Sequence, residues 1–272
     1  MANKLQQQDY RAMSQYIVDL WNGKISHGVL PNGHPNYITP PDIENKWSNE
    51  EFRNFLYRLV RKDIGAQEFR NLVSYIQTRE LAPLIAPDKG YYFTEDANEI
   101  QKAIDRKSGY IETEWGTVLC LRKSAGLSVS QDQLDKIEKS INPSERIKVY
   151  AEFVIDVFQG GHPEIPIPSK KKPIKDPQIR SLLFKHDFGN ENYNLKNPIN
   201  DVDYNLTIRW ARFISEPGFA ILSGKGYWTA QDRYEIMQTA NKKESKLNGM
   251  MASVNGLEKM KGVRRKKNGK LF

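Results

Sequence analysis

Two stretches of the sequence carry, at helical spacing, polar side chains of the kinds that read base edges in nucleic acids. Arginine pairs with guanine O6 and N7, and asparagine or glutamine pairs with adenine N6 and N7. The stretch Ala66–Arg79 predicts an amphipathic helix whose outward face carries Gln67, Arg70, Asn71, Ser74 and Gln77. The stretch Asp201–Ser215 predicts a second such helix, with Val202, Leu206, Trp210 and Phe213 inward and Asn205, Arg209 and Arg212 outward. Any solvated helix face has a similar composition, so the surroundings of the two helices decide the interpretation.

Directly after each of these stretches the chain repeats itself. Lys89–Ile100 reads KGYYFTEDANEI and Lys225–Ile236 reads KGYWTAQDRYEI, 136 positions later. In both copies a short apolar run, a polar turn, Lys-Gly and a pair of aromatic residues precede a polar, periodic segment. This pattern predicts a β-hairpin followed by a helix, twice in one chain. Lys89 and Lys225 stand at the predicted bends, and Tyr91 and Tyr227 follow them.

The elements around the hairpins follow the same order in both halves of the chain. In the first half we expect helices over Gln8–Trp21, from a capping box at Ser48 and Glu51 to about Lys62, over Ala66–Arg79, and from Asp96 to about Ser124. Leu127–Ile141 is polar and is interpreted as a linker. In the second half we expect helices over Ser144–Gln159, after Asp176, over Asp201–Ser215 and after the hairpin, with an extended Pro- and Lys-rich loop after the first.

This order, with a polar third helix leading into a basic hairpin, resembles the winged helix-turn-helix superfamily, most closely its members from bacteriophages and plasmids. Residues 69–100 carry the resemblance best and residues 202–236 carry it less well. It implies a mainly α fold with small β-hairpins (α+β), built as two tandem winged-helix domains related by an internal repeat. The domains would cover 1–126 and 142–262, joined by the linker 127–141 and followed by a basic tail, 263–272. Lys89, Lys225, Tyr91 and Tyr227 would then lie on the wings, where the lysines contact phosphates and the tyrosines either join them or pack beneath.

Charge and composition favour a nucleic-acid partner. The chain of 272 residues has a formal net charge of +8, and the segment from Lys242 to the end holds ten lysines and arginines against two glutamates. Arg264, Arg265, Lys266 and Lys267 form the densest part of this segment, which either stays solvated or meets nucleic acid by following a phosphate backbone or entering a minor groove. A single cysteine, Cys120, excludes an intramolecular disulfide and suits a reducing compartment. No signal peptide or membrane-spanning stretch is recognisable, so we expect a cytoplasmic protein of a bacterium or phage-infected cell, without membrane contact.

The sequence gives little support for an enzymatic function. No phosphate-binding loop, dinucleotide fingerprint or nucleophile elbow is recognisable, and no histidine stands at metal-ligand spacing from a cysteine or carboxylate. The carboxylates considered for a two-metal site, Glu164 with Asp187 or Glu95, Asp96 and Glu99, are more simply helix caps and dipole partners. We therefore expect no catalytic residues, no metal and no cofactor.

Two functions remain. The first is sequence-specific binding of double-stranded DNA in phage or plasmid replication initiation or transcription regulation, with replication or transcription proteins as further partners. The second is a protein–protein adaptor or structural protein that uses winged helices to dock a polymerase, a helicase or another phage protein. The near-neutral charge outside the basic segment leaves the second function open, whereas the outward arginines and the hairpin lysines favour the first.

Overall fold

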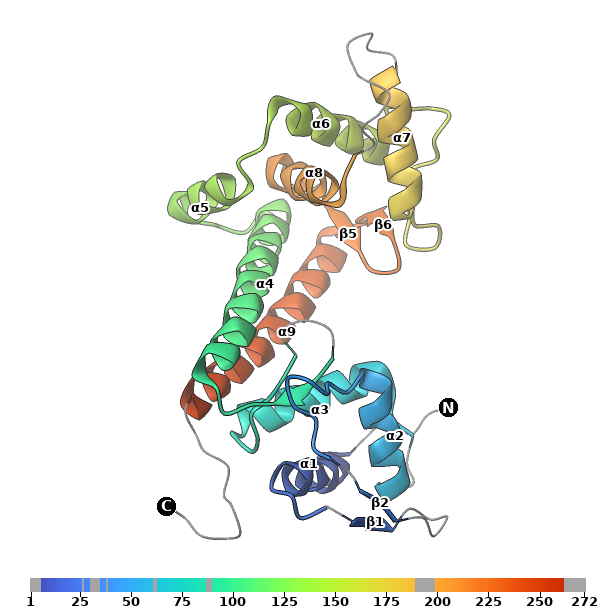
Figure 1. Ribbon diagram of the computed structural model, residues 1–272. Coiled ribbons are helices and arrows are strands. Elements are labelled where there is room, and N and C mark those ends of the chain that lie inside the picture. Colours follow the sequence, from blue (N-terminus) through green and yellow to red (C-terminus); the bar gives the residue numbers. More distant parts are fainter. Residues whose placement is uncertain are drawn as a thin grey trace. The chain divides into compact units, whose positions relative to one another are not determined.

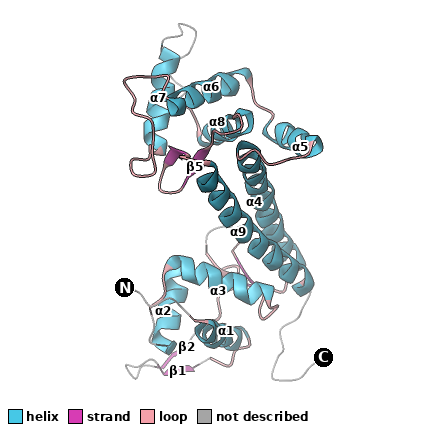
Figure 2. Ribbon diagram, turned by 180° about the vertical axis from the view of Figure 1, so that it is seen from behind, coloured by secondary structure: helices cyan, strands magenta, loops and turns pink. Residues whose placement is uncertain are grey.

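The computed structural model describes residues 6–25, 27–29, 35–37, 39–60, 63–86, 90–188 and 199–261. It is mainly helical with short antiparallel hairpins, as the sequence predicts (Figure 2). Its contacts form two compact units: unit 1 comprises Met1–Ile111 and Leu247–Phe272, and unit 2 comprises Glu112–Lys246 (Figure 1). The divisions fall inside two long helices, α4 (Ala97–Ser124) and α9 (Arg233–Met260), so each unit receives a segment of both.

Unit 1 is a three-helix core with a hairpin against it. Its elements are α1 (Gln7–Trp21), β1 (His27–Val29), β2 (Pro35–Tyr37), α2 (Asn49–Val60), α3 (Ala66–Thr78), β3 (Leu84–Ile85), β4 (Tyr92–Phe93), the first part of α4 and the last part of α9. Buried Met13, Ile17, Phe52 and Phe69 form the centre of the core. The predicted capping box begins α2: the Ser48 amide donates to Glu51 at 2.6 Å, and the Glu51 amide donates to the Ser48 hydroxyl at 3.1 Å.

Unit 2 also has helices followed by a short hairpin. Its elements are the last part of α4, α5 (Gln131–Ile141), α6 (Glu145–Gln159), α7 (Asp176–Phe188), α8 (Asp201–Ile214), β5 (Ile221–Ser223), β6 (Tyr227–Thr229) and the first part of α9. The N-terminus of α6 is capped by the Ser144 hydroxyl, and Gly160 ends the helix in the left-handed conformation. Tyr150, Phe158 and Tyr204 are the largest fully buried side chains of its core.

Contacts near the hairpins recur at the spacing of the sequence repeat. In unit 1 the hydroxyl of Tyr92 donates to Glu99 at 2.6 Å, and in unit 2 the indole of Trp228 donates to Glu235 at 3.2 Å. A residue from the loop before the second helix adds a third strand position to each hairpin. Trp47 pairs with Tyr91 in unit 1, and Ile174 pairs with Tyr227 in unit 2. Each hairpin is therefore held by two elements, the loop before the second helix and the helix that follows the hairpin.

The contacts group the chain differently from the domain boundaries expected from the sequence. In unit 1, Val254, Leu257 and Met260 of α9 pack against Ile85, Tyr92 and Ile104. In unit 2, Leu121 and Ala125 of α4 pack against Ala220, Leu222 and Ile236. The segment expected to be a linker contains α5, whose Ile137 and Ile141 are buried in the core of unit 2. Each hairpin thus packs against apolar residues of both α4 and α9.

Two glycines of α9 offer a matched test of this packing. A Cβ at Gly256 would collide with the backbone oxygen of Gln77, whereas a Cβ at Gly249 meets nothing within 4 Å. We expect Gly256→Ala to destabilise unit 1 by roughly 1–3 kcal/mol, since α9 must withdraw from α3. Gly249→Ala should be neutral or stabilising by up to about 1 kcal/mol, because alanine favours the helix. Thermal unfolding followed by circular dichroism compares the two, and equal effects would contradict this packing.

Candidate nucleic-acid interface

Helix α3 presents a connected polar surface to solvent. Gln67, Arg70 and Asn71 are exposed, and Ser74 is half-buried one turn further on. The side-chain amide of Gln67 donates to the Asn71 oxygen at 3.1 Å, and the Arg70 guanidinium donates to the Gln67 oxygen at 3.2 and 2.9 Å. The opposite face of α3 is buried through Phe69, Leu72, Val73 and Ile76. The predicted inward and outward faces of this helix are therefore confirmed, except at its last turn.

Gln77, predicted to face outward, is buried with 1% of its surface exposed. Its amide nitrogen donates to the backbone oxygen of Leu84 at 2.6 Å. The last turn of α3 lies where the chain turns back into β3. The buried backbone carbonyl of Leu84, the first residue of β3, needs a hydrogen-bond donor there. The prediction for Gln77 is wrong because this polar side chain holds the hairpin to the helix.

Gln77 also belongs to a buried network with Lys107 of α4 and Ser253 of α9. The Lys107 ammonium donates to the Gln77 oxygen and, at 2.6 Å, to the Ser253 hydroxyl. The Ser253 hydroxyl donates to the same Gln77 oxygen at 2.5 Å. No carboxylate forms an ion pair with Lys107 in the described part of unit 1. Burial lowers the pKa of Lys107 from its ordinary value of 10.5 to about 8, because its partners are neutral.

This network predicts a pH dependence of stability in the alkaline range. Between pH 8 and 10.5 the unfolded chain keeps the Lys107 proton that the folded chain has released, so stability rises with pH through this window and is constant below it. The full shift corresponds to an effect of the order of 3 kcal/mol. Lys107→Met removes the titrating group, so the unfolding free energy of this variant should not rise between pH 8 and 10.5. Denaturant unfolding at pH 7, 8, 9 and 10 measures both proteins, and parallel curves would contradict the account.

The two hairpin tyrosines pack beneath their hairpins, which is one of the two alternatives that the sequence left open. Tyr91 lies edge-on against Phe69, with ring centroids 5.0 Å apart, and also contacts Phe52. Tyr227 is half-buried, and its ring contacts Tyr204 at a centroid distance of 6.4 Å. Lys225 is exposed at the bend between β5 and β6. Lys89 and the tail residues Arg264, Arg265, Lys266 and Lys267 lie outside the described residues.

Helix α8 differs from its predicted orientation. Its buried residues are Tyr204, Thr207, Ile208, Trp210, Ala211 and Arg212. Val202, predicted to face inward, is 67% exposed, whereas Asn205 is exposed as predicted. The buried face is turned toward α6, with which α8 shares the core. The predicted buried face differs from the observed one by a rotation about the helix axis. Aromatic and aliphatic residues lie on several sides of α8, so the sequence is compatible with more than one apolar face.

The two arginines of α8 are correspondingly withdrawn from solvent. Arg212, predicted to face outward, is 9% exposed, and its Nε donates to the backbone oxygen of Ile221 at 2.9 Å. Its guanidinium also lies 5.8 Å from the centre of the Tyr227 ring. Arg209 is half-buried beside α5 and donates to the Ser140 hydroxyl at 3.0 Å. The prediction for Arg212 is wrong for the same reason as that for Gln77: each donates to the first strand of the hairpin that follows its helix.

A cationic loop beside the second hairpin was not among the predicted contacts. Lys171, Lys172 and Lys175 are exposed, while Lys170 forms an ion pair with Glu235 at 3.1 Å. The loop is held in place by Ile174, which pairs with Tyr227, and by Pro168, whose oxygen accepts the Thr229 amide at 2.9 Å. The sequence signal was the run SKKKPIK, which was interpreted only as an extended loop. These lysines and Lys225 thus lie on the second hairpin and on the loop that pairs with it.

The carboxylates considered for a metal site have other partners. Asp96 caps α4 by accepting the Asn98 amide at 2.7 Å, and Glu99 binds Tyr92 and Lys102. Glu164 lies 3.4 Å from one ring nitrogen of His162, whose other nitrogen is 3.0 Å from Asp156. Among the described residues, no group of three or more metal-ligand side chains converges.

Comparison with known proteins finds no match for this chain among protein-family models, curated proteins or solved structures. Within the described ranges, no helix combines the length and the apolar composition needed to cross a membrane.

Proposed function

We propose that this chain binds double-stranded DNA without catalysing a reaction, and that α3 reads base edges in the major groove. The observation that carries the proposal is the solvent-facing cluster of Gln67, Arg70 and Asn71 on a helix whose opposite face is buried. These three side chains supply the donors and acceptors that match guanine and adenine edges. Their mutual hydrogen bonds orient them before binding, which reduces the entropy lost on contact.

The proposed framework is a pair of winged-helix domains related by an internal repeat. In each unit three helices lead into the hairpin, α1, α2 and α3 in unit 1 and α6, α7 and α8 in unit 2, and a residue of the loop before the second of them pairs with the hairpin. This order supports the resemblance to winged helix-turn-helix proteins, and the matched contacts of Tyr92 with Glu99 and of Trp228 with Glu235 support the repeat. In such a domain the third helix enters a groove while the wing contacts the backbone.

The two units have unequal roles in this proposal. Unit 1 reads bases through α3. Of the polar residues predicted to face outward on α8 of unit 2, Asn205 is exposed to solvent, Arg209 is half-buried and Arg212 is buried. Unit 2 instead contributes phosphate contacts through Lys171, Lys172 and Lys225. The basic tail 263–272 extends the cationic contribution along the backbone. The setting that suits such a protein is replication initiation or transcription regulation in a phage or plasmid.

Base reading by α3 is tested with the double variant Arg70→Ala/Asn71→Ala. After selection of a preferred site from random duplexes, we expect the variant to bind that site at least about 10-fold more weakly and to discriminate less against random DNA. Arg11→Ala is the matched control, since Arg11 is also exposed in unit 1 but lies on α1. Fluorescence anisotropy measures all three proteins, and equal losses in the double variant and the control would refute base reading by α3.

Phosphate contact by unit 2 predicts a different pattern. Lys171→Ala/Lys172→Ala should weaken binding uniformly across duplex sequences and reduce the slope of log K against log salt by about 2. Lys136→Ala/Lys139→Ala removes the same charge from exposed positions of α5 and should leave the slope close to that of the wild type. A loss confined to the preferred site, or equal slopes in the two variants, would contradict a phosphate-binding role.

A second candidate function is protein docking by unit 2. It is favoured by the burial of Arg212 and the partial cover of Arg209, which remove two of the cations expected on α8. Exposed Val202 lies on the same helix. If duplex DNA binding survives every substitution in unit 2, this unit serves as the adaptor and unit 1 as the DNA-binding domain.

A further inference from the structure

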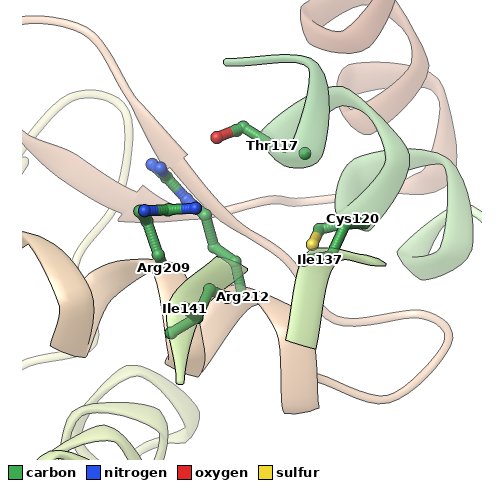
Figure 3. Close-up of a pocket in the computed structure, with 7 residues that line it drawn as sticks. Thr117, Cys120, Ile137, Ile141, Arg209 and Arg212 are labelled. Atoms are coloured by element: carbon green, nitrogen blue, oxygen red, sulfur yellow. The ribbon is translucent and has the colours of Figure 1, made fainter. Parts of the chain in front are cut away.

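A small cavity in unit 2 brings two arginines together at the meeting point of α4, α5 and α8. It is lined by Gly116, Thr117 and Cys120 of α4, Ile137 and Ile141 of α5, and Arg209 and Arg212 of α8 (Figure 3). The space has room for about one water molecule, with an opening to solvent. Figure 3 shows the guanidinium groups of Arg209 and Arg212 next to each other, with the hydroxyl of Thr117 turned toward their side of the cavity.

The two guanidinium groups have no carboxylate partner within ion-pair distance in the described part of unit 2. Glu114, the carboxylate that influences both arginines, is engaged by Lys243 at 2.6 Å. Glu112, which also influences Arg209, is exposed. The Cys120 thiol adds no negative charge, because burial raises its pKa to about 11. Two like charges therefore stand side by side, the Arg212 guanidinium buried and the Arg209 guanidinium half-buried.

The free hydrogen-bonding groups of this cavity are donors. Arg212 uses its Nε for the oxygen of Ile221, and Arg209 uses one terminal nitrogen for the Ser140 hydroxyl, which leaves guanidinium N–H groups on both. The Thr117 hydroxyl lines the same cavity and can donate a third hydrogen bond. A bound water molecule would accept hydrogen bonds from some of these donors but would not neutralise the positive charge. A buried charge without compensation is costly, and a counter-ion offsets that cost.

We propose that this cavity binds one inorganic anion of about the size of chloride, held by the guanidinium groups of Arg209 and Arg212 and by the Thr117 hydroxyl. The positively charged lining favours an anion as the ligand. The cavity has room for about one water-sized species, which favours a monatomic anion over phosphate or sulfate. Because the ligands come from α4 and α8, the bound anion ties these two helices together beside α5, which contributes Ile137 and Ile141 to the cavity wall. This site goes beyond the proposed DNA binding and does not depend on it.

Thermal unfolding of the full chain in sodium chloride and in sodium gluconate, at constant ionic strength, tests the site. We expect chloride to raise the Tm of the wild type by a few degrees in a saturable manner, as a ligand of the folded state does. Thr117→Val keeps the shape of the side chain and should lose most of this rise, as should Arg209→Gln. Arg11→Gln, which removes one positive charge from unit 1, should keep it.

Bromide provides an independent measurement. Crystals grown in bromide should show an anomalous peak between Arg209, Arg212 and Thr117 in the wild type and none in Thr117→Val. The same chloride response in the wild type and in Thr117→Val, or stabilisation by phosphate that exceeds that by chloride, would overturn the proposal.

Discussion

The hydrogen bond from the last turn of the third helix to the first strand of the hairpin is the constraint on which both units depend. In unit 1 the donor is the amide of Gln77 and the acceptor is Leu84, and in unit 2 the donor is Arg212 and the acceptor is Ile221. Leu84 and Ile221 each face the last strand residue across the hairpin, Phe93 and Thr229. The bond satisfies a buried carbonyl that would otherwise cost about 1–3 kcal/mol, and it fixes the hairpin relative to the helix that precedes it.

The two donors lead to different chemistry in the two units. Gln77 is neutral, and it shares its oxygen with Lys107 and Ser253, which ties α4 and α9 to the same point. Arg212 brings a positive charge into the core of unit 2, next to Arg209, and thereby creates a need for a counter-ion. Unit 1 keeps the outward face of α3 open, whereas α5 occupies part of the corresponding surface in unit 2. This difference is why we assign base reading to one unit and backbone contacts to the other.

Local patterns in the sequence predicted the helices other than α5, the hairpins β3–β4 and β5–β6, and the polar face of α3, because periodicity and turn residues act over a few positions. Gln77 and Arg212 were misassigned because a helical pattern does not show which polar side chain will meet a carbonyl of the next element. The rotation of α8 was missed because residues such as Val202, Tyr204 and Leu206 offer more than one apolar stripe. The contribution of both α4 and α9 to each unit could not be predicted, since it depends on contacts between residues far apart in the sequence.

The central claim, that folded domains of this chain bind duplex DNA, is tested most directly by anisotropy measurements on the full chain and on a variant lacking residues 263–272. Both proteins are titrated with labelled duplex at several salt concentrations. The account predicts that the shortened protein still binds and that its affinity falls with salt by a smaller slope than that of the full chain. Absence of binding, or binding that disappears with the tail, would contradict it and would make protein docking the function to pursue.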